Sequence, residues 1–333
     1  MRGIPGGIQG VKWAMANLGR HEERQSSAKI LLALARWGHK CLPFAQLRTV
    51  NWILRLNGGQ QLALRCRLFD YELKLQADRS PVHAMLYLRG EDFVEDAAVL
   101  APYLQAGMTV FDVGANIGYL TYFFCRCVEP GGIVFSFEPD AANFGELVEN
   151  VKRNNITSCY PLQLAVGSAS GTVCFAPGLN GHIDEGTGLA HNCRLISLDS
   201  FLEQRSLSRV DLVKIDVEGW ELDVLEGMRG ILTGPNKPIL YVEVHPQGFL
   251  GKGDPEAVCC FLQKHYRRIT AFRTWSDVRG GLPAWRRLGR SLLRDAGHPQ
   301  PIPLSELRQR RLERFQLLCL PEKNNGHHVG RLV

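Results

Sequence analysis

The segment 110–121 constrains the fold more than any other part of this chain. It reads Val-Phe-Asp-Val-Gly-Ala-Asn-Ile-Gly-Tyr-Leu-Thr, so an apolar strand leads into a turn with two glycines and then into a helix. Gly114 and Gly118 permit a tight turn and let a ligand approach the backbone closely. Glu138 follows at the end of the next expected strand, twenty residues after Gly118. This layout is typical of a site for a nucleotide moiety, although a strand, turn and helix without a ligand would share it.

Asp112 distinguishes two classes of ligand. A dinucleotide places its pyrophosphate at the helix N-terminus, next to a G-x-G-x-x-G turn. Here the glycines are spaced G-x-x-x-G, and a carboxylate at position 112 would repel a phosphate. S-adenosylmethionine has no phosphate and carries a sulfonium and an ammonium group, which a carboxylate attracts. The sequence therefore favours S-adenosylmethionine, and a nicotinamide-dependent oxidoreductase is the alternative.

Strands alternate with helices from residue 109 onward, which predicts a doubly wound α/β fold with a parallel sheet covered on both faces. The apolar runs predict strands at Thr109–Val113, Ile133–Glu138, Pro161–Val166, Leu212–Asp216 and Ile239–Val244. Helices are expected at 118–127, 141–154, 219–228 and 255–265. Further short strands are expected at 171–175, 194–197, 269–272 and 315–320.

The charges divide the chain into three parts. Residues 1–67 hold 11 Lys and Arg against 2 Asp and Glu, and residues 264–333 hold 15 against 5, whereas the middle is acidic. We expect a basic, mainly helical N-terminal extension over 1–67, one catalytic domain over 68–321 and a flexible tail over 322–333. Basic flanks suit nucleic acid, anionic lipid or an anionic substrate, or they are a solvated surface. Residues 25–56 mix apolar and basic side chains, as in an interfacial helix pair, a helical lid or a dimer contact.

Composition indicates a cytoplasmic protein, with peripheral contact at the inner membrane face as a further option. There is no apolar run of 18 residues, and the first twenty residues lack the apolar block of a signal peptide. The ten cysteines are scattered, and none forms a C-x-x-C pair, which is typical of reduced thiols.

Several motifs follow one another in series along the chain. They are Phe111–Gly118, Phe137–Pro139, Asn150, Asn154, Ala165–Gly167, Leu198–Asp199, Lys214–Glu221, Leu225 and Gly227. In this order and spacing they resemble the FkbM-type S-adenosylmethionine-dependent methyltransferases over roughly residues 72–245. The resemblance implies a class I methyltransferase fold, with a seven-stranded sheet whose last strand is antiparallel. It also implies O-methylation of a hydroxyl group on a sugar, a glycan or another natural-product acceptor.

The cofactor residues are expected at the carboxyl ends of the first three strands, where an open parallel sheet binds its ligands. Asp112 and Asn116 are predicted to receive the methionine ammonium group, directly or through water, while Gly114 and Gly118 let the backbone approach the ligand. Glu138 has two acceptor oxygens for the two ribose hydroxyls, or it is a solvated carboxylate at a strand end. The small apolar residues Ala165 and Val166 are predicted to flank the adenine.

Candidate bases for an acceptor hydroxyl follow the fourth and fifth strands. His245 and Asp216 are the favoured candidates, but Asp216 or Glu243 would need a raised pKa to act as the base, or else would have an orienting role. Asp216 and Glu218 have an alternative role in capping the helix that follows. Asp216, Glu243 and His245 are also possible ligand types for a divalent ion, but their spacing is no recognised metal motif, so no metal is predicted.

The acceptor is expected to be a small molecule or a glycan. Nucleic acid is not expected, because the fourth strand ends in Asp-Val-Glu-Gly instead of the Asn/Asp-Pro-Pro-aromatic turn of adenine methyltransferases. The polar segment 177–192 is a candidate acceptor lid or a tolerated surface insertion. A non-catalytic protein that binds membrane or nucleic acid through its basic flanks is the remaining alternative.

Overall fold

The computed structural model describes residues 63–76, 81–176, 182–183, 191–245, 254–273, 300–302 and 314–322, besides the isolated positions 29 and 31. The predicted segments 25–56 and 177–192 therefore lie almost wholly outside the described residues. The described residues up to Phe93 belong to one compact unit, and those from Val94 onward belong to a second unit. Among the described residues, no helix has the length and apolarity needed to cross a membrane.

The first unit is a β-hairpin followed by two helices. Strand β1 (Ala63–Leu68) pairs antiparallel with β2 (Tyr71–Gln76), and α3 (Pro81–Arg89) and η1 (Gly90–Phe93) follow. Phe69 and Asp70 have positive φ angles, as a two-residue hairpin turn of this kind requires. The domain boundary expected between residues 67 and 68 falls inside β1, and the hairpin keeps both strands in one unit.

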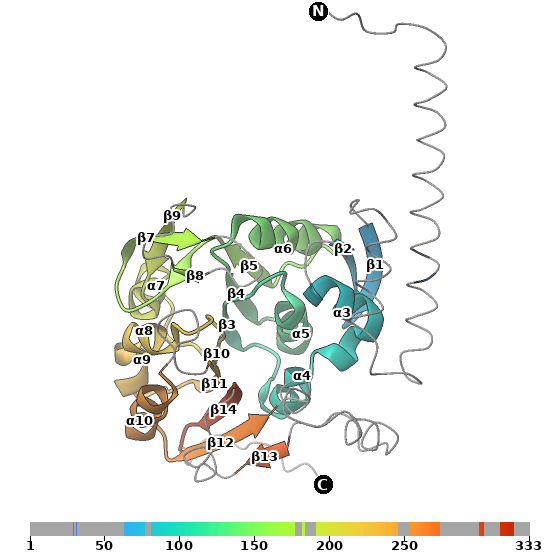
Figure 1. The fold of residues 1–333 in the computed structure, drawn as a ribbon. Helices are drawn as coiled ribbons and strands as arrows, with labels where there is room; N and C mark the ends of the chain where they lie inside the picture. Colours follow the sequence, from blue (N-terminus) through green and yellow to red (C-terminus); the bar gives the residue numbers. More distant parts are fainter. Residues whose placement is uncertain are drawn as a thin grey trace, which may run out of the picture. The chain divides into compact units, whose positions relative to one another are not determined.

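The second unit is built on a mixed sheet of eight strands (Figure 1). Its order is β13-β12-β14-β11-β10-β3-β4-β5, and the five strands from β11 to β5 are parallel. Strand β14 runs antiparallel between β11 and β12, and β13 is a short antiparallel addition at the edge. The predicted class I arrangement is confirmed, with seven strands plus β13. The strands are β3 (Thr109–Val113), β4 (Ile133–Phe137), β5 (Cys159–Leu162), β10 (Leu212–Ile215), β11 (Ile239–Val244), β12 (Arg268–Arg273), β13 (Gln300–Ile302) and β14 (Phe315–Leu320).

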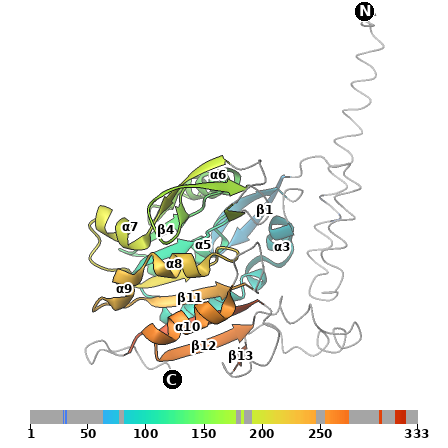
Figure 2. The same cartoon turned by 60° about the vertical axis from the view of Figure 1, so that its left-hand side comes forward.

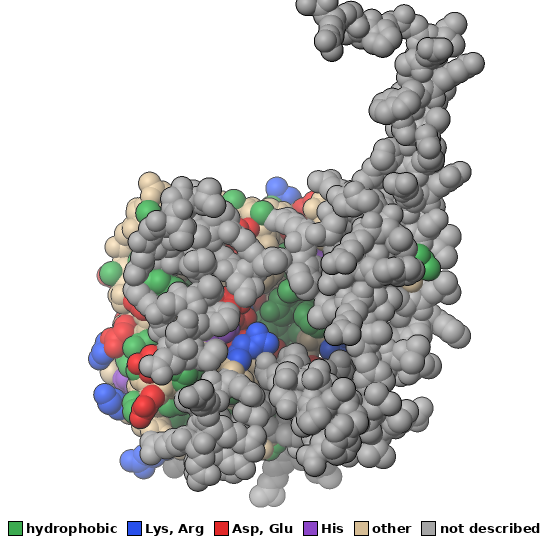
Figure 3. Space-filling view, in the orientation of Figure 1, with side chains coloured by type: hydrophobic (Ala, Val, Ile, Leu, Met, Phe, Trp, Pro, Cys, Tyr) green, Lys and Arg blue, Asp and Glu red, His purple; other side chains and the backbone are tan. Residues whose placement is uncertain are grey.

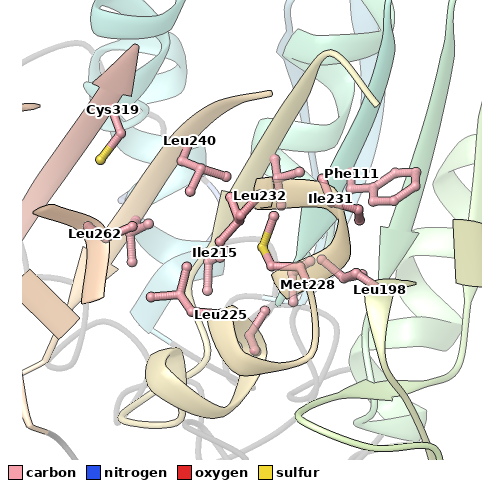
Figure 4. Packing of buried hydrophobic residues seen from close by; sticks show 14 of the residues in the cluster. Phe111, Leu198, Ile215, Leu225, Met228, Ile231, Leu232, Leu240, Leu262 and Cys319 are labelled. Carbon is pink, nitrogen blue, oxygen red and sulfur yellow. The ribbon is translucent and has the colours of Figure 1, made fainter. Parts of the chain in front are cut away.

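One face of this sheet is wholly apolar. Helices α7 (Leu198–Gln204), α8 (Glu221–Glu226), α9 (Arg229–Thr233) and α10 (Pro255–His265) supply side chains to its core cluster. Figure 2 shows α8, α9 and α10 along the face of β11 and β12, and Figure 4 shows Leu225, Met228 and Ile231 packed against Ile215 and Leu240. Burial of such side chains stabilises the fold by about 1.5–3 kcal/mol each.

The opposite face carries a row of polar side chains in its middle. The strand register aligns Ser136 of β4, Asp112 of β3, Lys214 of β10 and Tyr241 of β11. Helix α5 (Tyr119–Val128) covers this row, and its Thr121 hydroxyl donates a hydrogen bond to Asp112. Helices α4 (Asp96–Leu100) and α6 (Ala141–Arg153) belong to the same unit. A buried polar row is stable only if its members satisfy one another, so the row fixes how β3, β4, β10 and β11 are aligned.

The predicted third strand, Pro161–Val166, is wrong as a single strand. Strand β5 ends at Leu162, and the chain bends where the Leu164 N–H bonds to the Leu162 carbonyl. Ala165 and Val166 then form β6, which belongs to a separate sheet of order β6-β9-β7-β8. The other members are β7 (Gly171–Ala176), β8 (His182–Ile183) and β9 (His191–Ile196), so the short strands predicted near 171 and 194 are confirmed.

Glycine is required at position 114, because the backbone that follows β3 lies close to the backbone that follows β10. The φ angle of Gly114 is 77°, and a Cβ atom there would lie 1.8 Å from the carbonyl oxygen of Asp216.

We expect Gly114→Ala to lower the free energy of unfolding by at least about 3 kcal/mol, because the backbone of β10 would have to move. Gly145→Ala is the control: Gly145 lies within α6, where a Cβ meets nothing, so the variant gains about 0.5–1 kcal/mol. Urea unfolding followed by circular dichroism measures both, and equal stabilities would contradict this account.

Candidate active site

The candidate site lies at the carboxyl ends of β3, β4, β10 and β11. The chain order along the sheet reverses between β3 and β10, and ligands of open α/β sheets bind at such a point. Each strand end is followed by a polar or glycine residue: Gly114 after β3, Glu138 after β4, Asp216 after β10 and His245 after β11. In Figure 3 acidic and basic side chains lie close together near the middle of the face.

Glu138 is held where the sequence predicted it, at the tip of β4. Its Oε2 accepts the N–H of Asn116 at 2.7 Å, and its Oε1 accepts the N–H of Asp140 at 3.0 Å. Each carboxylate oxygen retains a second lone pair, so the pair can still accept two hydroxyl groups in a fixed geometry. These oxygens therefore fit the ribose diol of an adenosine-containing cofactor.

The ionisation of Glu138 is finely balanced. Burial raises its pKa to about 7, although the two backbone N–H groups oppose the shift. Hydroxyl donors stabilise the ionised form of a carboxylate and would lower this pKa. Binding of a diol and loss of the proton are therefore linked.

Asp112 lies near the carboxyl end of β3, but its side chain is turned into the protein. It is 0% exposed, on the polar face of the sheet beneath α5. Oδ2 accepts the Thr121 hydroxyl at 2.6 Å, and Oδ1 lies 3.3 Å from Nζ of Lys214. The charge of Asp112 is therefore matched by an internal lysine, and its contact with a methionine ammonium group, directly or through water, stays a prediction.

Lys214 joins the two central strands. Its ammonium group donates to the carbonyl oxygen of Gly114 at 2.7 Å, and it lies 3.6 Å from a carboxylate oxygen of Asp216. Burial alone would lower the pKa of Lys214, but Asp112 and Asp216 outweigh burial and raise it above its usual value. The buried lysine is therefore charged.

The turn that follows β3 is shaped by the protein itself. Asn116 has a φ angle of 53°, and its Oδ1 accepts the N–H of Ile117. A Cβ at Gly118 would lie 2.5 Å from Leu147, so this glycine is explained by helix packing. Both predicted glycines are thus required by close contacts within the fold, and ligand approach need not be invoked for them.

Ala165 and Val166 lie in β6 of the smaller sheet. Both residues are buried, and Val166 belongs to the core cluster. The strand of the main sheet that precedes them ends at Leu162, whose carbonyl accepts the N–H of Glu138 at 3.0 Å. The contact of Ala165 and Val166 with the adenine stays a prediction.

The ends of β10 and β11 bring four carboxylates around one imidazole. Nδ1 of His245 lies 2.7 Å from Oε1 of Glu221, and Nε2 lies 3.1 Å from Oε2 of Glu218. Nε2 also lies 3.8 Å from Glu243, whose carboxylate is held by Arg314 at 2.9 Å. One ligand-type atom each of Asp216, Glu218 and His245 lies within 4.8 Å of the other two.

These contacts change the roles predicted from the sequence. Burial lowers the pKa of His245, but Glu218 and Glu221 outweigh burial and raise it to about 11. The imidazole therefore holds its proton at neutral pH and does not serve as a general base in this arrangement. The capping alternative for Asp216 and Glu218 is not supported either, because α8 begins at Glu221 after Trp220, which makes no side-chain cap.

Three further residues were not predicted from the sequence. Glu221 reaches His245 only because Glu218 and Gly219 both have positive φ angles, which delays the helix to residue 221. Gln316 lies opposite Glu243 on β14, and its buried Oε1 accepts no hydrogen bond from the described residues. Tyr119, at the start of α5, has its pKa raised by burial and by Asp216 and Glu243.

The sheet order and the strand-end site define a class I methyltransferase. A sequence profile described as the methyltransferase FkbM domain matches residues 112–269. Hexuronic acid methyltransferase AglP of Haloferax volcanii is 35% identical over 205 residues, which cover 60% of this chain and 81% of that protein. The chain belongs to the FkbM methyltransferase family and is a methyltransferase that depends on S-adenosylmethionine.

Two further matches are more distant. The 31-O-demethyl-FK506 methyltransferase FkbM of Streptomyces tacrolimicus is 29% identical over 185 residues, covering 45% of this chain and 70% of that protein. The crystal structure of methyltransferase FkbM from Methylobacillus flagellatus KT has 17% identity and a TM-score of 0.39, covering 64% of this chain and 43% of that chain. The fold assignment rests on the strand order, because this structural likeness is low.

We expect cofactor affinity to increase with pH through the range in which Glu138 ionises. Only the carboxylate accepts both ribose hydroxyls, so binding is full above the pKa of about 7 and weakens below it. The Kd of S-adenosylhomocysteine, measured by calorimetry, should be about tenfold higher at pH 6 than at pH 8. Glu138→Gln should weaken binding roughly tenfold to a hundredfold and abolish this dependence. Glu149→Gln, an exposed carboxamide variant on α6, is the control, and an unchanged slope in Glu138→Gln would refute the role.

Loss of the Lys214 charge should destabilise the protein strongly. Lys214→Met leaves Asp112 buried without its cation, and we expect a loss of about 3–5 kcal/mol in the free energy of unfolding. Asp112→Asn combined with Lys214→Met should cost less than the sum of the single variants. Arg65→Met, which removes an exposed ion pair with Glu72, should cost no more than about 1 kcal/mol. The free energies of unfolding are measured with urea for both single variants and the double variant. If the effects of Asp112→Asn and Lys214→Met simply add, the two residues are not coupled.

Proposed function

We propose that this enzyme transfers the methyl group of S-adenosylmethionine to a hydroxyl group of a sugar, a glycan or another natural-product acceptor. One observation supports the proposal above others. At the reversal point of the sheet, Glu138 offers a diol site on one side, and carboxylates after β10 and β11 stand on the other. The names of two relatives, a hexuronic acid methyltransferase and a demethyl-FK506 methyltransferase, support an oxygen-rich acceptor.

The chemistry needs little more than alignment and removal of one proton. When bound, S-adenosylmethionine supplies a methyl group on a good leaving group, the sulfonium. Rigid alignment of two reactants can contribute roughly 7–11 kcal/mol, and a positioned base adds roughly a hundredfold to ten-thousandfold in rate. The protein groups must therefore hold the acceptor oxygen in line and accept its proton.

We assign to Asp216 the role of the general base, which accepts the proton of the acceptor hydroxyl. Its side chain is 15% exposed, and among the described residues its nearest charged partner is Lys214 at 3.6 Å. Glu243 is engaged by Arg314, and both nitrogens of His245 face carboxylates, so these two candidates are already occupied by protein groups.

Peripheral membrane contact through residues 25–56 stays a separate prediction. The segment lies almost wholly outside the described residues, and its mixed apolar and basic sequence supports the proposal. Cosedimentation with anionic vesicles, lost on deletion of residues 1–62 and weakened by salt, tests it.

The test of the function is methyl transfer to an identified hydroxyl. The enzyme is incubated with isotope-labelled S-adenosylmethionine and fractionated sugar, glycan and metabolite pools, and mass spectrometry locates the added methyl group. We expect label on oxygen, and Asp216→Asn to lower kcat roughly a hundredfold to ten-thousandfold while the Kd of S-adenosylhomocysteine stays within about twofold.

Asp70→Asn is the matched control for this variant. Asp70 is exposed in the β1–β2 turn, where its φ angle of 73° also suits asparagine, so kcat should be unchanged. Label on nitrogen, or full kcat in Asp216→Asn, would contradict the proposal.

A further inference from the structure

The cluster after β10 and β11 has the composition of a metal centre. Asp216 and Glu218 each offer a carboxylate oxygen, His245 offers a ring nitrogen, and these three atoms all lie within 4.8 Å of one another. Metal bonds of about 2.1 Å require ligand atoms about 3 Å apart when adjacent and about 4.2 Å apart when opposite. The 3.1 Å between Glu218 Oε2 and His245 Nε2 already equals the separation of adjacent ligands.

The imidazole is oriented as a ligand imidazole usually is. Nδ1 of His245 lies 2.7 Å from Glu221, whose carboxylate also accepts the N–H of Gly219 at 2.9 Å. His245 and Glu221 are each 1% exposed. A buried carboxylate on one ring nitrogen fixes the ring, and it leaves the other nitrogen directed at the metal. Here that other nitrogen, Nε2, faces Glu218 and Glu243.

Oε2 of Glu218 is the buried oxygen at the centre of this cluster. Its charged neighbour among the described residues is Nε2 of His245 at 3.1 Å. A buried carboxylate needs a cation close by, and without a metal ion the proton on Nε2 supplies that charge. A divalent ion in place of this proton would bind the oxygen and the deprotonated nitrogen together.

We propose that Asp216, Glu218 and His245 bind a divalent cation, with Glu221 as the residue that positions the imidazole. Two carboxylates and one imidazole are ligands suited to Mn²⁺, with Mg²⁺ as a weaker competitor. Each residue gives the ion one atom, so one oxygen of Asp216 remains for the acceptor proton. The role of the ion rests on the proposed function: it binds the acceptor oxygen, lowers the pKa of the hydroxyl and holds it in line.

Metal binding itself is measured without cofactor or acceptor. The full-length enzyme is treated with a chelator, dialysed and titrated with MnCl₂, and free Mn²⁺ is followed by electron paramagnetic resonance. We expect one site per chain, competition by MgCl₂ and a rise in Tm with Mn²⁺. Glu218→Gln and His245→Gln should each raise the Kd for Mn²⁺ at least about tenfold, and Glu221→Gln about tenfold to a hundredfold.

Glu226→Gln is the matched control, since it lies on the same helix as Glu221 and pairs with Arg229 at the surface. It should bind Mn²⁺ like the unmodified enzyme. If Glu221→Gln or His245→Gln fails to fold, Glu218→Gln, whose side chain is 24% exposed, still gives the ligand test.

The outcomes separate this inference from the proposed function. Absence of Mn²⁺ and Mg²⁺ binding at millimolar concentrations in the unmodified enzyme, or equal Kd values in Glu218→Gln and Glu226→Gln, overturns the metal site even if methylation proceeds. Methyl transfer that survives complete chelation overturns the role of the ion. Mn²⁺ binding without methylation of any hydroxyl acceptor supports the site and overturns the proposed function.

Discussion

The buried ammonium group of Lys214 is the interaction on which the rest of the structure depends. It contacts Asp112 of β3, Asp216 after β10 and the backbone carbonyl of Gly114. The two central strands are therefore tied together at the point where the sheet order reverses, which is where the site lies. A network of this kind has a cost, because each buried charge loses its hydration. The network of buried charges lies on the sheet face toward α5, while the other face is packed with apolar side chains, which need no hydrogen-bond partner.

Lys214 lies between two halves of the site, one at the ends of β3 and β4 and the other at the ends of β10 and β11. On the β3 and β4 side, the turn is built from backbone groups, with Glu138 accepting N–H bonds from two loops. On the β10 and β11 side, charged side chains face one another around His245. A rigid half built mainly from backbone groups suits a large cofactor held by many contacts, whereas a half crowded with charged side chains suits the proton and charge changes of the reaction. Lys214 lies between them and sets their spacing through the strand register.

The positions of the site could be predicted from the sequence, but the directions of its side chains could not. Strand ends follow from apolar runs and glycines, so β3, β11 and β14 and the location of Glu138 are predictable. Whether a residue in such a strand faces a ligand or a neighbouring helix depends on partners distant in sequence. Asp112 is the example: its partner Lys214 is 102 residues away, and this buried pairing could not be read from the strand pattern. Ala165 is similar, since its place in a separate strand after Leu162 comes with pairing to β9.

The turn between β10 and α8 shows why the charged half cannot be explained by stability alone. Glu218 adopts a left-handed backbone, which is costly for a residue that is not glycine, and its carboxylate then joins three others around one imidazole. A helix cap at this place would have required neither the strain nor the crowding of charge, and α8 has no side-chain cap. Local rules are broken at sites where function compensates for the loss. The arrangement is therefore best understood as one that a cation completes, with Glu221 and His245 held in place for it by the fold.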